Sequence, residues 1–219
     1  MRGVAFAPKR DSDGLKDARE FQNEARAFAA GRDCRVCVFD NGAPMAARLS
    51  EVKQFLANEQ SLDYVAFFCH GWADGIQAGL RRRDLKDFVA WLKPRIVTKS
   101  FRVLLYCCST AEDGLASTDD LTPGTGGEGG FADQFADQLW FAGVNVEVYG
   151  HVTAGHTTRN PYVRRFTGSG EGRVGGEWLV QPKTPYWSKW VKLLTTKYRF
   201  DYPFESQAQI ESRLRQQIP

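Results

Sequence analysis

The stretches YVAFFCHG (Tyr64 to Gly71) and FRVLLYCCST (Phe101 to Thr110) decide the fold of this chain. Each is mainly a run of apolar residues and stops on a reactive side chain, His70 in the first and the Cys107–Cys108 pair in the second. Continuous apolar character is typical of strands in a parallel sheet, because such strands are buried on both faces. We therefore expect two parallel strands, adjacent in space, that carry these side chains at their carboxyl ends.

The alternation continues on both sides of these stretches. Apolar runs at residues 4–7, 34–39 and 144–149 predict three more strands. Apolar residues at steps of three and four predict helices over about residues 15–28, 45–56, 85–92 and 131–142. Such alternation predicts an α/β three-layer sandwich, with a mainly parallel sheet and helices on both faces.

A change of composition predicts where the core ends. The glycine-rich stretch TGSGEGRVGG follows Phe166, and tryptophan, tyrosine and lysine residues are interleaved beyond it. We assign residues 1–165 to a catalytic core and residues 166–219 to an extension that packs on the core. Lysine stems lying on aromatic rings suit a cap on the sheet edge, and stacking on bases or sugars is the alternative.

Bulk composition narrows the function classes. The chain has 219 residues, 42% hydrophobic and 25% charged, with a formal net charge of +3, which predicts an ordinary globular protein without a nucleic-acid or membrane partner. No apolar run approaches the roughly 18 residues that a membrane span needs. The short apolar N-terminal run turns charged at once, which favours a cytosolic location. The five cysteines are irregularly spaced and do not suggest a disulfide framework.

The chemistry is expected at the carboxyl edge of the sheet, where open parallel sheets place their active sites. His70 alone would most simply be a satisfied strand-end histidine, and the cysteines alone would be small buried apolar residues. Together they favour nucleophilic catalysis, because an imidazole can take the proton of a thiol and later return it to a leaving amine. The N–H groups of Gly71 and of the cysteine would form an oxyanion hole.

The doubled cysteine requires a choice. Successive side chains of a strand point to opposite faces. Cys107 still belongs to the apolar run and is expected to pack under a helix. Cys108 opens the polar segment CSTAEDG, where the chain leaves the sheet, and is the predicted nucleophile.

The motifs FFCHG and LLYCCSTA resemble those of the caspase-like cysteine peptidases, which include caspases, metacaspases, gingipains, clostripain and the CHAT proteins. The second motif is similar to the Ala-Cys-Glu-Thr of CHAT proteins, with Thr110 on the threonine and Cys108 on the nucleophile. The resemblance covers roughly residues 1–165. It implies catalytic His70 and Cys108, Gly71 in the oxyanion hole, a polypeptide substrate, and no metal or other cofactor in the chemistry.

The chain also departs from true caspases. It lacks Gln-Ala-Cys-Arg-Gly, and its His–Cys separation of 38 residues (108 minus 70) is shorter than the roughly 50 of caspases. Aspartate specificity is therefore unsupported. A basic P1 residue would need a carboxylate, for which the candidates are Asp40, Asp74, Asp119 and Asp120. An acidic P1 residue would instead use Arg81, Arg82 or Arg83.

Two rival functions stay open. One is a catalytically silent binding module with the same fold, and the other is a small-molecule thiol hydrolase or a redox protein that uses Cys107–Cys108. His151 and His156, in HVTAGH, are expected in a surface loop rather than at the active-site rim. Cys34 and Cys37 are expected on opposite faces of a strand, which suits neither a metal site nor a redox pair.

Overall fold

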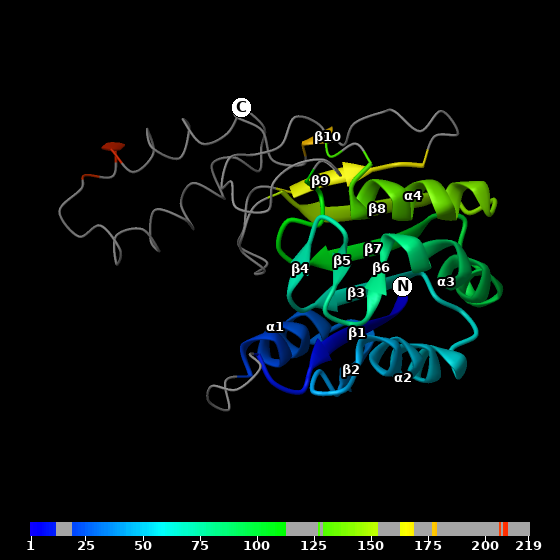
Figure 1. Ribbon diagram of the computed structural model, residues 1–219, viewed down its shortest axis with the longest axis horizontal. Helices are drawn as coiled ribbons and strands as arrows, with labels where there is room; N and C mark the ends of the chain where they lie inside the picture. Colours follow the sequence, from blue (N-terminus) through cyan, green and yellow to red (C-terminus); the bar gives the residue numbers. More distant parts are fainter. Residues whose placement is uncertain are drawn as a thin grey trace.

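The computed structural model describes residues 1–11, 19–112, 127, 129–152, 163–168, 177–178, 206 and 208–209. In these residues a seven-stranded sheet forms the centre of the molecule, in the order β10-β9-β8-β7-β3-β1-β2 (Figure 1). The predicted α/β class with a mainly parallel sheet is confirmed.

Five parallel strands make up most of the sheet. They are β1 (Arg2–Pro8), β2 (Asp33–Phe39), β3 (Tyr64–Phe68), β7 (Phe101–Tyr106) and β8 (Val146–His151). Each matches one of the five apolar runs that the sequence indicated. Two antiparallel strands, β9 (Val163–Phe166) and β10 (Glu177–Trp178), extend the sheet beyond β8. The sheet is therefore mixed.

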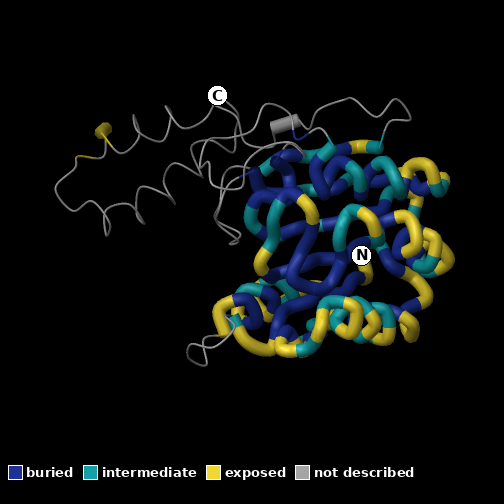
Figure 2. Tube along the Cα trace, in the orientation of Figure 1, coloured by how far each residue is buried: buried dark blue, intermediate teal, exposed yellow. Residues whose placement is uncertain are grey.

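Helices pack on both faces of the sheet. On one face, α1 (Glu20–Ala29) buries Phe21 and Ala25 against alanines of β1 and against Ala66 and Phe68 of β3. On the other face, α2 (Met45–Ala57), α3 (Leu85–Leu92) and α4 (Phe131–Phe141) enclose the larger apolar core. Short 3-10 turns, η1 (Arg82–Asp84) and η2 (Lys93–Arg95), flank α3. The burial colours in Figure 2 follow this arrangement, with buried strands inside and exposed outer helix surfaces.

A second, three-stranded sheet follows β3 and was not predicted. Its strands are β4 (Gly71–Trp72), β5 (Gly75–Ile76) and β6 (Leu80–Arg81), in antiparallel order. Each strand is only two residues long, too short to produce a hydrophobic period. Gly79, with φ of +90°, makes the tight turn before β6, and a Cβ there would lie 2.2 Å from the Met45 carbonyl oxygen. This sheet continues directly from His70.

The predicted division near residue 166 falls within β9, and β10 of the extension pairs with β9. Most of residues 166–219 lie outside the described residues, so the packing of the extension stays a prediction. Among the described helices, none is both long and apolar enough to cross a bilayer.

Candidate active site

The two stretches that stop on reactive side chains meet. β3 and β7 are paired in parallel, with Phe68 opposite Tyr106 as the last pair in the register. The expected adjacency of the strands is confirmed. The next residues along each strand, Cys69 and Cys107, thus follow at the same level, and His70 and Cys108 come one step later.

Cys107 is part of the packed core. Its Sγ lies 3.6 Å from the Sγ of Cys69 and 3.4 Å from the Phe67 carbonyl oxygen, and both thiols are fully buried. Burial, and then the hydrogen bond with Cys69, raise the pKa of the Cys107 thiol well above its ordinary value. A thiolate at this position is strongly disfavoured, which suits the predicted packing role.

The turn that follows the strand is fixed on two sides. Thr110 donates its hydroxyl to the Cys107 carbonyl oxygen over 3.3 Å, and its own carbonyl accepts the N–H of Ala132 in α4 at 2.9 Å. Ala111 donates its N–H to the carbonyl of His151, at the end of β8, at 2.9 Å. Ser109 has a φ of 54°, a left-handed conformation that non-glycine residues rarely adopt. Strained backbone of this kind is held only by its surroundings, and it follows directly after the half-buried Cys108.

Gly71 lies directly against this turn. A Cβ at Gly71 would be 2.7 Å from the Cβ of Cys107, 2.8 Å from the Cys108 carbonyl oxygen and 2.9 Å from Cγ2 of Thr110. Glycine is therefore required for the two strand ends to approach this closely.

The register of the small sheet directs the Gly71 N–H. Gln77 donates its N–H to the His70 carbonyl oxygen at 2.9 Å, which makes these two residues a hydrogen-bonded pair. Such pairs alternate with non-hydrogen-bonded ones along an antiparallel ladder. Gly71 and Ile76 therefore form a non-hydrogen-bonded pair. The N–H of Gly71 is consequently directed away from β5.

His70 is exposed but held in one orientation. Its Nε2 lies 2.7 Å from the main-chain carbonyl oxygen of Asp11, a residue in the segment that follows β1. Because a carbonyl oxygen only accepts hydrogen bonds, Nε2 carries the proton, and Nδ1 of the neutral ring is the basic nitrogen. The Phe21 ring of α1 packs edge-on against the imidazole, with ring centres 5.0 Å apart.

Two of the four predicted substrate carboxylates, Asp40 and Asp74, are described, and both have partners of their own. Asp40 directly follows β2, which lies two strands away from β3 and so about 10 Å across the sheet, and its carboxylate accepts the N–H of Gly42 at 3.0 Å. Asp74, in the β4–β5 turn, forms a 2.6 Å ion pair with Arg82. Asp119 and Asp120 lie outside the described residues. Among the described site residues, Gly71 lies against the Cys108 turn, and His70 directly precedes Gly71 in the chain.

His151 differs from its expectation. It was expected in a surface loop, but it ends β8, is 2% exposed, and packs edge-on to Tyr106 with ring centres 6.1 Å apart. The expectation was wrong because β8 extends two residues beyond the predicted strand. His156 lies outside the described residues. Cys34 and Cys37 do pack toward opposite faces of β2, as predicted.

Sequence reasoning also missed three residues that support His70. They are Asp11, Gln22 and Asn41, whose contacts involve the backbone at the end of β1. In the sequence, these three residues are marked only as polar side chains that follow a strand or lie near the start of a helix. Many surface residues share that feature, so it could not identify them.

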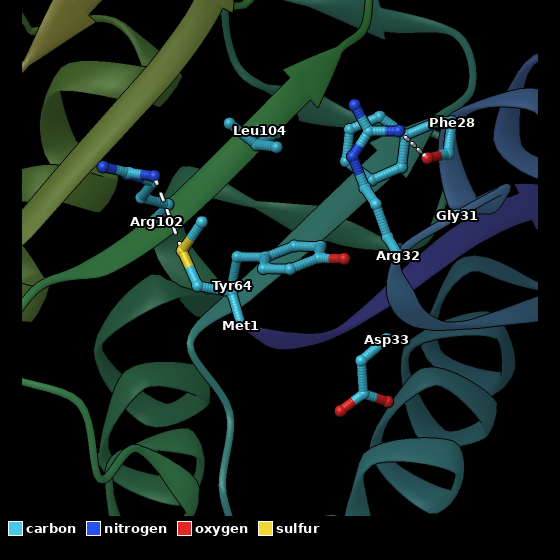
Figure 3. Close-up of a pocket in the computed structure, with 8 residues that line it drawn as sticks. All are labelled: Met1, Phe28, Gly31, Arg32, Asp33, Tyr64, Arg102 and Leu104. Atoms are coloured by element: carbon cyan, nitrogen blue, oxygen red, sulfur yellow. Dashed lines mark hydrogen bonds between the residues drawn. The ribbon is translucent and has the colours of Figure 1, made fainter.

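A pocket of about 370 Å³ lies elsewhere, at the amino edge of the sheet (Figure 3). Tyr64, at the start of β3, lies between Arg102 of β7 and Arg32, and none of the predicted site residues lines it. In the part of the chain that the structure describes, no three or more histidine, cysteine or acidic side chains are grouped to hold a metal ion. A scan of protein-family models and a search of curated proteins find no match to this chain.

Proposed function

We propose that this chain is a cysteine endopeptidase of caspase-like fold, with Cys108 as nucleophile and His70 as general acid and base. The observation that carries the proposal is the 2.7 Å contact of His70 Nε2 with the Asp11 carbonyl oxygen, at the carboxyl end of the strand that pairs with β7. Because a carbonyl oxygen only accepts hydrogen bonds, this contact favours the Nε2–H form of the ring, in which Nδ1 is the nitrogen that would take the thiol proton.

The division of roles between the cysteines supports the same function. Cys107 faces the core of α2, α3 and α4, where it packs on Cys69. Side chains alternate, so Cys108 begins on the other face, on which His70 packs against Phe21 of α1. A redox protein that uses the Cys107–Cys108 pair is disfavoured, because the neighbour of the Cys107 sulfur is Cys69.

The reaction proceeds through a thioester. The Cys108 sulfur attacks the carbonyl carbon of the scissile peptide bond as its proton passes to Nδ1 of His70. The N–H groups of Gly71 and Cys108 stabilise the oxyanion. The C–N bond then breaks, and the imidazolium returns its proton to the leaving amine. Water, deprotonated by His70, hydrolyses the thioester and restores the thiol.

Selective alkylation of Cys108 tests the proposal. Near neutral pH, iodoacetamide should modify Cys108 faster than the other cysteines, and His70→Ala should slow this reaction. Peptide-library cleavage should accompany it and vanish in Cys108→Ala. Equal alkylation of Cys108 in wild type and His70→Ala, without cleavage, would instead support a binding module. Loss of cleavage in a well-folded Cys107→Ala that matches the loss in Cys108→Ala would overturn the assignment of the nucleophile.

A further inference from the structure

The main chain that leaves β1 is held by side chains from two other elements. We refer to residues 8–11 as the β1 exit segment. Asn41, in the turn after β2, donates its Nδ2 to the Arg10 carbonyl oxygen at 2.9 Å and accepts the Arg10 N–H at 3.0 Å. It is 2% exposed. One buried amide side chain thus satisfies both backbone groups of the residue just before Asp11.

A second amide holds the segment from the side of α1. Gln22 donates Nε2 to the carbonyl oxygens of Pro8, at 3.1 Å, and Lys9, at 2.9 Å. Gln22 is also buried, and it follows Phe21, which packs on the His70 ring. The element that supports the imidazole edge-on therefore also fixes the carbonyls leading to Asp11.

Asp11 accepts hydrogen bonds with both its side chain and its main chain. Its carboxylate accepts the N–H groups of Glu20 and Phe21, at 2.5 Å and 3.3 Å, at the start of α1. Its main-chain carbonyl accepts Nε2 of His70. A carbonyl in an unsupported loop can rotate away from a partner, whereas this one follows residues whose backbone groups are already bound.

We infer that Asn41 and Gln22 are positioning residues for the general base. They hold the β1 exit segment so that the Asp11 carbonyl keeps the proton of His70 on Nε2, which makes Nδ1 the nitrogen that would act as the base. The role in catalysis rests on the proposed peptidase function, but the control of the histidine tautomer does not. A purely structural role would satisfy buried polar groups and affect stability alone.

The tautomer of His70 separates these two roles. The chain has only three histidines, so ring-¹⁵N NMR of labelled protein is tractable, and His70→Gln assigns the His70 signals. With the imidazole neutral, wild type should show the Nε2–H tautomer. Asn41→Ala and Gln22→Leu should each give a mixture of tautomers and slow alkylation of Cys108 by about 10-fold or more. Gln22→Leu retains bulk at its site, so it decides the outcome if Asn41→Ala does not fold.

Asp63→Ala is the matched control. The Asp63 carboxylate also accepts a backbone N–H, that of Arg2 at 2.7 Å, but at the opposite edge of the sheet. Its loss should leave both the tautomer and the alkylation rate unchanged. A wild-type tautomer in a folded Gln22→Leu or Asn41→Ala protein overturns the inference. A variant-dependent tautomer without peptidase activity in wild type would uphold the positioning and reject the proposed function.

Discussion

The amino edge of the central sheet and the His70 site at its carboxyl edge hold their polar residues by different partners. At the amino edge, charged groups neutralise one another. Buried Glu59 forms ion pairs with Arg2 and Arg35 at 3.0 Å and 2.9 Å. At the carboxyl edge Asp74 and Arg82 also form an ion pair, at 2.6 Å, whereas His70 is held by a main-chain group, the Asp11 carbonyl. A carbonyl partner orients the imidazole without itself carrying a formal charge, which suits the acid–base role proposed for His70.

Both edges also contain a glycine in a tight contact. Gly3 of β1 supports the ring of Tyr64 at the amino edge, where a Cβ would lie 2.3 Å from Cε2 and Cζ of the ring. Gly71 supports the Cys108 turn at the carboxyl edge. The comparison therefore offers a matched pair of substitutions, with similar crowding but different expected consequences.

Gly71→Ala should produce the largest effect. The added Cβ meets the Cys108 carbonyl, a backbone atom that cannot move without the turn. We expect kcat, measured on a peptide found by library screening, to fall about 100-fold, with a loss of roughly 1–3 kcal/mol in stability. Gly3→Ala should cost similar stability and leave kcat unchanged. Equal losses of kcat in the two variants would remove the functional distinction between the edges.

Much of this arrangement could be predicted from sequence. The five parallel strands have mainly apolar runs, and the four helices have regular apolar steps, so these patterns identified them. Different roles could be assigned to Cys107 and Cys108 because successive side chains point to opposite faces of a strand. Cys107 indeed points into the α2–α4 core.

The rest could not be predicted, for a common physical reason. The support of His70 comes from main-chain carbonyls, which every residue possesses, so no side-chain pattern identifies the Asp11 contact. Asn41 and Gln22 are distant from His70 in sequence and act through that backbone. The two-residue strands β4 to β6 are likewise set by the contacts of the chain near His70 rather than by a period of their own.

Cys107→Ala sharpens the comparison within the carboxyl edge. Cys107 is fully buried beside Cys69, so its truncation should leave a small cavity and lower the free energy of unfolding by about 1–2 kcal/mol. Cleavage should persist with kcat within about threefold of wild type, because such packing changes leave the Cys108 turn anchored at Thr110 and Ala111. Urea unfolding and peptide cleavage measure the two effects. Lost activity at unchanged stability would place Cys107 in the chemistry.

Glu147→Gln should have the smallest effect and a distinctive pH dependence. Burial of Glu147 opposes ionisation, but hydrogen bonds from Arg102 and Tyr149 and the charges of Arg102 and Arg165 outweigh it, so the pKa of this carboxyl is lowered. A lowered folded-state pKa stabilises the protein above the unfolded value of about 4.3, and this contribution is lost as pH falls through the folded-state pKa.

Because Arg102 is 42% exposed, solvent screens the pair, and the loss at pH 7 should be at most about 1 kcal/mol. Urea unfolding of wild type and Glu147→Gln from pH 7 down to about pH 3 measures it. The difference should shrink below about pH 4, and high salt should reduce it at pH 7. Asp33→Asn, at an exposed carboxylate of the same edge, is the control. If the difference in unfolding free energy between the two proteins stayed constant with pH, Glu147 would act by packing. The ion pairs of Glu147 would then not distinguish the amino half of the sheet from its carboxyl edge.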